Sequence, residues 1–229
     1  MVPGADGAAI LGSGQLMVTA RVTAPGRASA SANRVLLLDP VAREVVDEVQ
    51  LALDDAGISV IVHPRDGSVL LAAGMGQDGS QLFAARVASQ RLSVSPVLEN
   101  VVACGFDPAG DRLLLVPHVS YGPEAFVVAW PSLARIVAVT PGGNGLAEDP
   151  FYFCGCFLDQ DEVLLTTVHP DGLRPVICSG NLDPRALATL PGYGSDSGLE
   201  LVSVLGTAPG TFAAELEGHG TTLATVWRL

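Results

Sequence analysis

The sequence contains no lysine. Its basic side chains are 12 arginines, set against 24 aspartate and glutamate residues, so its 229 residues carry a formal net charge of −12 at pH 7. A protein that binds nucleic acid must neutralise phosphates with lysine and arginine, so this balance argues against DNA or RNA as a partner. An acidic surface instead favours a basic protein partner.

Long hydrophobic runs are also missing. No stretch approaches the roughly 18 unbroken apolar residues that a membrane-spanning helix needs. The opening MVPGADGAAI has neither the basic start nor the long apolar core of a secretory signal. We therefore expect no membrane association and a cytoplasmic location.

Cysteine is scarce, with four residues at Cys104, Cys154, Cys156 and Cys178. There is no C-x-x-C pair of the kind that zinc sites use. Because side chains alternate along a strand, Cys154 and Cys156 are predicted on one face, and Cys104 of the neighbouring repeat on the other. We expect free, buried thiols that act as small apolar residues, with no metal and no cofactor.

The stretch Val101–Gly143 shows what is present instead. Short apolar runs rich in Val, Leu and Ile alternate with turn residues such as DPAGD at Asp107–Asp111. This pattern predicts four short strands joined by tight turns. The strands are expected at Val101–Phe106, Arg112–Val116, Glu124–Trp130 and Arg135–Thr140.

The same unit recurs along the chain. Its first turn residue falls at Leu11, His63, Asp107, Leu158 and Leu205, at spacings of 52, 44, 51 and 47 residues. A four-stranded unit of this length, repeated five times, predicts an all-β fold, a five-bladed β-propeller in one domain spanning 1–229. The blades are expected at about 8–52, 58–99, 101–143, 150–191 and 199–229.

Several segments resemble known propeller repeats. GFDPAGDRLLLV (Gly105–Val116) is similar to the F-x-P-x-G-x-x-L turn and strand of bacterial WD-like and TolB-like propellers. VLLLDPVAREVV (Val35–Val46) and VVAWPSLARIVAV (Val127–Val139) are similar to the last two strands of WD repeats. No unit combines Gly-His with Trp-Asp, so the hydrogen-bonded tetrad of strict WD repeats is absent.

The last unit ends after its third strand, Thr221–Leu229. Two sources for the missing fourth strand are open: the N-terminal residues Met1–Gly7, which we favour, or strand exchange with a partner. The loop Thr23–Asn33 is predicted to be long and exposed, and Asp47–Gly57 is predicted as a fourth strand followed by an outer loop.

Catalytic patterns are absent. Propeller glycosidases place two or three carboxylates in a central funnel that the first strands of the blades line, yet the expected first strands contain a single acid, Glu200. No nucleophile elbow, phosphate loop or H-E-x-x-H motif occurs either. We therefore expect no enzymatic activity.

A candidate binding face is predicted where the second strands end. Aligning the repeats brings several polar side chains to that position, or close to it in the loops: Arg21, His118, Tyr121, His169 and His219. The sequence favours a non-catalytic protein–protein interaction module or scaffold within a bacterial complex. The alternative is a lectin-like propeller that binds a sugar or another small ligand.

Overall fold

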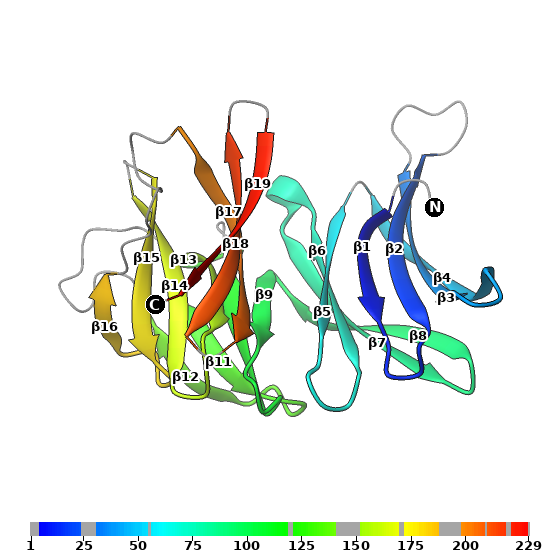
Figure 1. Ribbon diagram of the computed structural model, residues 1–229, viewed down its shortest axis with the longest axis horizontal. Coiled ribbons are helices and arrows are strands. Elements are labelled where there is room, and N and C mark those ends of the chain that lie inside the picture. Colours follow the sequence, from blue (N-terminus) through cyan, green and yellow to red (C-terminus); the bar gives the residue numbers. More distant parts are fainter. Residues whose placement is uncertain are drawn as a thin grey trace. The chain divides into compact units, whose positions relative to one another are not determined.

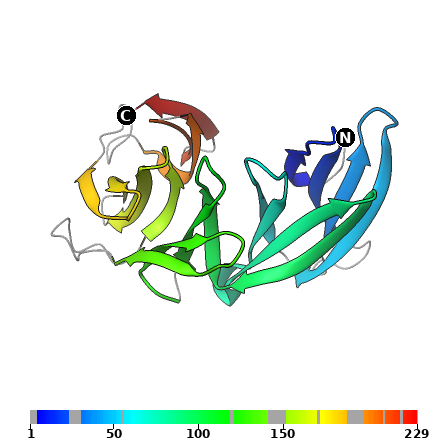
Figure 2. The same ribbon diagram turned by 90° about the horizontal axis from the view of Figure 1, so that it is seen from below.

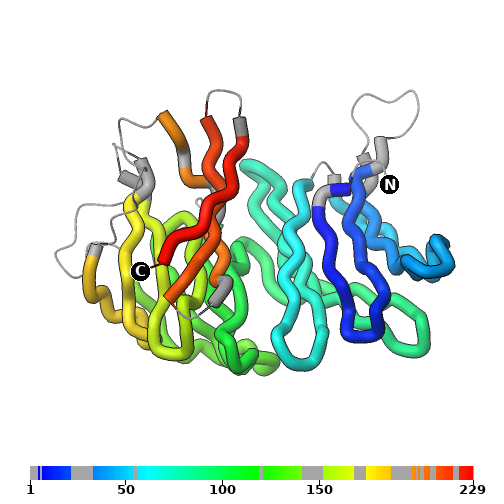
Figure 3. The backbone as a smooth tube through the Cα atoms, viewed as in Figure 1, coloured from blue at the N-terminus to red at the C-terminus, as the bar shows by residue number. Residues whose placement is uncertain are grey.

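Runs of β-branched and leucine residues that end at Gly, Pro, Asp or Asn become strands throughout the protein. The computed structural model describes residues 5–23, 31–54, 56–118, 121–140, 152–169, 172–187, 198–208, 210–218 and 221–228 (Figure 3). These residues fall into two compact units, Met1–Val102 and Ala103–Leu229, which are described separately below.

The first unit contains two four-stranded sheets in which strands adjacent in sequence pair antiparallel (Figure 1). Blade one consists of β1 (Ala5–Ile10), β2 (Leu16–Thr23), β3 (Ser31–Asp39) and β4 (Glu44–Asp54). Blade two consists of β5 (Gly57–Val62), β6 (Val69–Gly74), β7 (Ser80–Ala88) and β8 (Arg91–Glu99), with a short 3-10 turn at Gly76–Asp78 between β6 and β7.

The second unit contains three sheets of the same kind. Blade three consists of β9 (Val101–Phe106, which begins at the end of the first unit), β10 (Arg112–Pro117), β11 (Ala125–Ala129) and β12 (Arg135–Val139). Blade four consists of β13 (Tyr152–Phe157), β14 (Glu162–His169), β15 (Gly172–Ser179) and β16 (Pro184–Leu187). Blade five consists of β17 (Glu200–Ala208), β18 (Thr211–Gly218) and β19 (Thr221–Arg228).

Each sheet is therefore an antiparallel meander, and five such meanders in succession are the blades of a β-propeller. The predicted all-β, five-bladed fold is confirmed, with a last blade of three strands. Among the described residues, no helix is long and apolar enough to cross a membrane.

Facing sheets in each unit bury one side of their strands. In the first unit Met17, Val35 and Leu37 of blade one share a core with Leu71 and Ala85 of blade two. The first strands of these two blades, β1 and β5, lie side by side, as Figure 2 also shows. In the second unit the core between blades four and five contains Leu164, Phe212 and Trp227, where the two aromatic rings stack with centroids 5.6 Å apart.

The first strands approach each other closely at glycines. A Cβ atom on Gly206 of β17 would lie 2.1 Å from the Phe157 carbonyl oxygen of β13. A Cβ atom on Gly7 of β1 would lie 2.7 Å from a methyl carbon of Val60 in β5. Glycine at these positions is required by space between neighbouring blades.

Two boundary predictions are corrected. Both ends of the loop expected at Thr23–Asn33 are strand, because β2 continues to Thr23 and β3 begins at Ser31, while residues 24–30 lie outside the described residues. The strand expected within Asp47–Gly57 is confirmed, but it extends from Glu44 to Asp54 because pairing with β3 continues through the acidic residues.

The favoured source of the missing strand is also wrong for the residues that the structure describes. Ala5 and Gly7 pair with Ala20 and Thr19, so they belong to the first strand of blade one rather than to blade five. In the described part of the chain, β19 pairs with β18 alone. The equivalent third strands β3, β7, β11 and β15 each pair with a fourth strand on their other edge.

Candidate functional site

The structure brings together two of the five residues predicted for a binding face. His118 follows β10, and its carbonyl oxygen accepts a 2.8 Å hydrogen bond from the Tyr121 N–H. The two rings meet edge to face with centroids 6.0 Å apart. The Nδ1 atom of His118 is buried and has no hydrogen-bond partner within the described chain, whereas Tyr121 is exposed.

The other three predicted residues do not join this pair. Arg21 lies in the first unit, inside β2 rather than past its end, and donates a 3.4 Å hydrogen bond to the Ala56 carbonyl oxygen. His169 is the last residue of β14, and its side chain lies outside the described atoms. His219 lies outside the described residues. The predicted set is therefore not assembled as one site in the described structure.

The count of acids on first strands needs a correction. Because β1 begins at Ala5, it includes Asp6, so the first strands contain Asp6 as well as Glu200. The two residues belong to different units. The first blade was expected to begin at about residue 8, but Ala5 and Gly7 pair with β2 and so extend its first strand towards the N-terminus.

The four thiols are free, as predicted, but only Cys156 and Cys178 are buried, whereas Cys104 and Cys154 are half-buried. Cys154 and Cys156 both pack against the core between blades four and five, which confirms that they share a face. Burial raises the pKa of Cys154 to about 11 and that of Cys178 to about 12. Burial and the nearby Cys154 and Cys156 thiols raise the pKa of Cys104 further. Such thiols stay protonated near neutral pH and react slowly.

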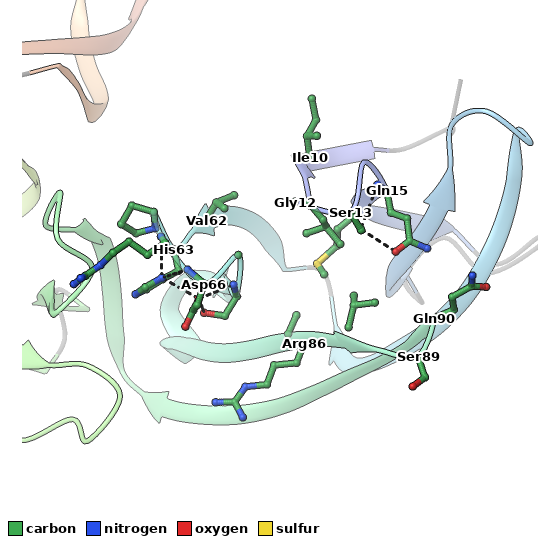
Figure 4. A pocket seen from close by; sticks show the side chains of 18 of the residues that line it. Ile10, Gly12, Ser13, Gln15, Val62, His63, Asp66, Arg86, Ser89 and Gln90 are labelled. Atoms are coloured by element: carbon green, nitrogen blue, oxygen red, sulfur yellow. Dashed lines mark hydrogen bonds and ion pairs between the residues drawn. The ribbon is translucent and has the colours of Figure 1, made fainter.

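The described residues form an open groove of about 990 Å³ in the first unit (Figure 4). Three turns contribute to it: Leu11–Gln15 between β1 and β2, His63–Ser68 between β5 and β6, and Ser89–Gln90 between β7 and β8. Its lining includes the side chains of Ile10, Val62 and Arg86. No residue of this groove was predicted as a site residue.

His63 organises one wall of the groove. Its side chain is buried, and Nδ1 accepts hydrogen bonds from the backbone N–H groups of Arg65 and Asp66, at 3.2 and 3.0 Å. The same Nδ1 atom lies 2.9 Å from the Asp66 carboxylate oxygen Oδ1, within the same tight turn. His63 is therefore a turn-stabilising residue.

Asp66 completes this turn. Its Oδ1 atom accepts a 2.6 Å hydrogen bond from the Ser68 hydroxyl and a 2.8 Å bond from the Ser68 N–H. Burial alone would raise the pKa of Asp66, but these bonds, with the nearby His63 and Arg86, lower it. The Ser68 hydroxyl donates to a carboxylate and not to an imidazole, so Ser68, His63 and Asp66 lack the order of contacts of a catalytic triad.

A second wall has an unusual backbone. Ala88 pairs with Arg91, so Ser89 and Gln90 form a two-residue hairpin turn. Their φ angles are 51° and 62°. Two successive positive φ angles define a type I′ turn, which favours Asn-Gly because side chains with a Cβ atom strain in this region. Both residues are exposed and line the groove.

Sequence reasoning missed the groove because its turns are far apart in the chain. The sequence did contain one local signal. Ser89 and Gln90 lie alone between two strand-like runs, and a two-residue hairpin turn usually contains glycine. The repeat alignment placed His63 only as the first residue of a turn.

No protein-family model matches the sequence, and no curated protein matches it. Solved structures do match. A prolyl endopeptidase has a TM-score of 0.58 and 13% identity, over 93% of this chain and 34% of its own. The propeller of Dos1 has a TM-score of 0.58 and 7% identity, over 98% of this chain and 55% of its own.

The β-propeller domain of the Trilobed protease from Pyrococcus furiosus also matches, with a TM-score of 0.51 and 11% identity, over 93% of this chain and 77% of its own. The chain thus spans only about a third of the prolyl endopeptidase and about half of the Dos1 chain. At these identities the likeness extends to the propeller fold alone.

Proposed function

We propose that the protein is a non-catalytic protein–protein interaction module that serves as a scaffold within a bacterial cytoplasmic complex. The resemblance of its repeats to bacterial WD-like and TolB-like propellers is part of this proposal. The main support for the proposal is the outer edge of β19, which pairs with no strand in the described structure. In the other four blades, a fourth strand pairs with the equivalent edge of the third strand.

An uncovered third strand suits strand addition by another polypeptide. Main-chain N–H and C=O groups along such an edge pair with an incoming extended segment. The side chains of Leu223 and Val226 on β19 are exposed, at 46% and 64%, and would give that segment apolar contacts. The propeller domain of the Trilobed protease, which has a similar fold, is described as having an open velcro topology.

Charge supports a protein partner of basic character. The net charge of −12 gives the surface a negative potential, which attracts basic proteins and repels nucleic acid. The proposed partner is therefore a basic protein, and neither a membrane nor a nucleic acid is a proposed partner.

The chemistry of the described side chains supports a role without catalysis. Ser68 and Asp66 are hydrogen-bonded within one turn. The thiols of Cys154 and Cys178 have raised pKa values and are protonated near pH 7. A catalytic nucleophile or general base needs a pKa close to the working pH, whereas the pKa values of these two thiols are shifted away from it.

The lectin-like alternative finds less support. Sugar sites usually stack an aromatic ring on the ligand, and the described groove lining includes no Phe, Tyr or Trp. The exposed Tyr121 beside His118 is the feature that favours sugar or small-ligand binding.

A pull-down with matched variants tests the proposal. The purified chain is the bait in lysate of its native cells, beside two variants. Val226→Lys places a charge on the β19 edge, and Val41→Lys places the same charge on a still more exposed valine in blade one. We expect a stoichiometric partner with the wild type and with V41K, and its loss with V226K. Glycan binding without a protein partner, or equal recovery with V226K, would contradict the proposal.

A further inference from the structure

We infer that the partner segment that pairs with β19 is an antiparallel strand in which apolar residues alternate with lysine or arginine. The inference rests on the proposed function, because it describes the polypeptide that the β19 edge is proposed to bind. It goes further by giving the chemistry of each face of that strand.

The edge of β19 lacks the features that protect the other outer strands from pairing. Exposed strand edges are usually blunted by charged residues, proline or short length. Among the described outermost strands, β12 and β16 have only five and four residues. The longer strands β4 and β8 carry charges and a proline: Glu44, Asp47, Glu48, Asp54, Arg91, Pro96 and Glu99. By contrast, β19 has eight residues, and its segment Thr221–Trp227 contains neither a charge nor a proline. This edge therefore suits pairing with a further strand.

One face of the added strand should be apolar. By register, Leu223, Thr225 and Trp227 lie on the side of β19 that faces the core between blades four and five. In the first unit, a fourth strand extends the core with side chains two positions apart, Leu51 and Leu53 of β4. Leu223 is 46% exposed at the open edge. Apolar residues at alternate positions of the added strand would cover it in the same way.

The opposite face of blade five carries negative charge. Glu215 pairs with Ala224, and Glu217 pairs with Thr222, so both exposed carboxylates lie on the side away from this core. An added strand would lie about 10 Å from β18, roughly two strand spacings. Lysine and arginine side chains reach across such a distance over the short Ala224 and Thr222. Aspartate or glutamate at the same positions would be repelled.

The basic residue of β19 does not cancel this charge. Arg228 pairs with Thr211, at the opposite end of the ladder from Thr222 and Ala224. The added strand is therefore expected to place its basic residues beside Thr222 and Ala224 and an apolar residue beside the exposed Val226.

Binding of short peptides to the full chain, measured by fluorescence anisotropy, tests the pattern. One peptide has the eight-residue length of β19 and alternates valine with lysine, and a second alternates valine with glutamate. We expect the lysine peptide to bind with a Kd about threefold lower or better. Its affinity should fall as salt increases, because exposed charges are screened. Equal Kd values for the two peptides would overturn the inference.

Methylated peptides test whether the contact is strand pairing. The lysine peptide is made with N-methyl groups on its valine amides in one version and on its lysine amides in another. Successive amides point to opposite edges of a strand, and an antiparallel strand with valine facing the core presents one edge to β19. One version should therefore lose binding and the other keep it. Unchanged binding by both versions would overturn the inference.

Matched double variants locate the charge. Glu215→Gln with Glu217→Gln should raise the Kd of the lysine peptide about threefold or more. Glu44→Gln with Glu99→Gln removes the same charge from exposed positions in the first unit and should leave the Kd nearly unchanged. Glu215→Lys with Glu217→Lys should reverse the preference, so that the glutamate peptide binds more tightly. Equal Kd values in the two glutamine variants would overturn the inference.

Sedimentation of the chain without peptide tests a second copy as the occupant. We expect a monomer, because two chains of net charge −12 repel each other. A dimer that Val226→Lys disrupts would show that β19 pairs with another copy, and would overturn the inference.

The two proposals fail separately. If the pull-down recovers a partner that V226K loses, but the lysine and glutamate peptides bind equally, the proposed function stands and this inference is wrong. If the lysine peptide binds as expected, yet no cellular partner depends on the β19 edge, the proposed function is wrong and the preference of the edge remains.

Discussion

The Asp107 carboxylate accepts a 2.9 Å hydrogen bond from Nε of Arg112, and the same guanidinium donates to the carbonyl oxygens of Gln160 and Gly180 in the next blade. Asp107 is buried and also accepts the backbone N–H groups of Asp111 and Arg112. The turn of blade three is therefore fastened to two turns of blade four within the second unit.

Removing this guanidinium should destabilise the second unit. Arg112→Ala removes the charged donor of the buried Asp107 Oδ2 atom and of two carbonyl groups, which we expect to lower the free energy of unfolding by about 2–3 kcal/mol. The matched control is Arg185→Ala, which breaks an exposed ion pair with Glu162 and should cost about 0.5 kcal/mol or less. Urea denaturation measures both. Equal decreases in the free energy of unfolding for the two variants would show that the Arg112 hydrogen bonds contribute no more than an exposed ion pair.

The glycines between first strands give a second test. Gly206→Ala places a Cβ atom against the Phe157 carbonyl oxygen, so β17 and β13 must separate, at a cost of about 2–3 kcal/mol. Gly12→Ala meets no atom within 4 Å and should be nearly neutral. Thermal unfolding of both variants is the measurement. A neutral Gly206→Ala would contradict the close approach of these strands.

The pH dependence of stability follows from Asp66. Its pKa in the folded protein is lowered, so it contributes stability above its unfolded pKa, and this contribution is lost as pH falls through the folded value. We expect Tm of the wild type to fall more steeply than that of Asp66→Asn below about pH 4. Parallel Tm profiles for the two proteins would refute the assignment.

Thiol chemistry gives a prediction for the folded state. Because burial raises the pKa of Cys154 and Cys178, both should react with a thiol reagent at pH 7 far more slowly than after unfolding in urea. Mass spectrometry of alkylated peptides at successive times separates the sites. Modification of Cys154 in the folded protein at the unfolded rate would contradict its burial.

The sequence predicted the strands well where apolar runs and turns agreed. Val101–Phe106 was predicted with the bounds that β9 has, because DPAGD follows it and Asp107 caps that turn. Ala5–Gly7 was missed because small and acidic residues have weak strand propensity, and only pairing with β2 makes them a strand.

The site was harder to predict than the fold. Arg21 and His118 share an alignment position, but the structure places them in different units and puts Arg21 within a strand. The groove depends on Gln15, His63 and Gln90, which come together only through packing of two blades. Side-chain convergence of this kind is a tertiary property, and repeat alignment carries no information about it.

Amide hydrogen exchange of β19 tests the central claim most directly. The exchange rates of Thr221–Arg228 are measured in the isolated chain and in the complex recovered with its partner, with the outer strand β12 as the internal control. Strand addition predicts strong new protection along β19 and little change in β12. Unchanged exchange in β19 within the complex would contradict the account.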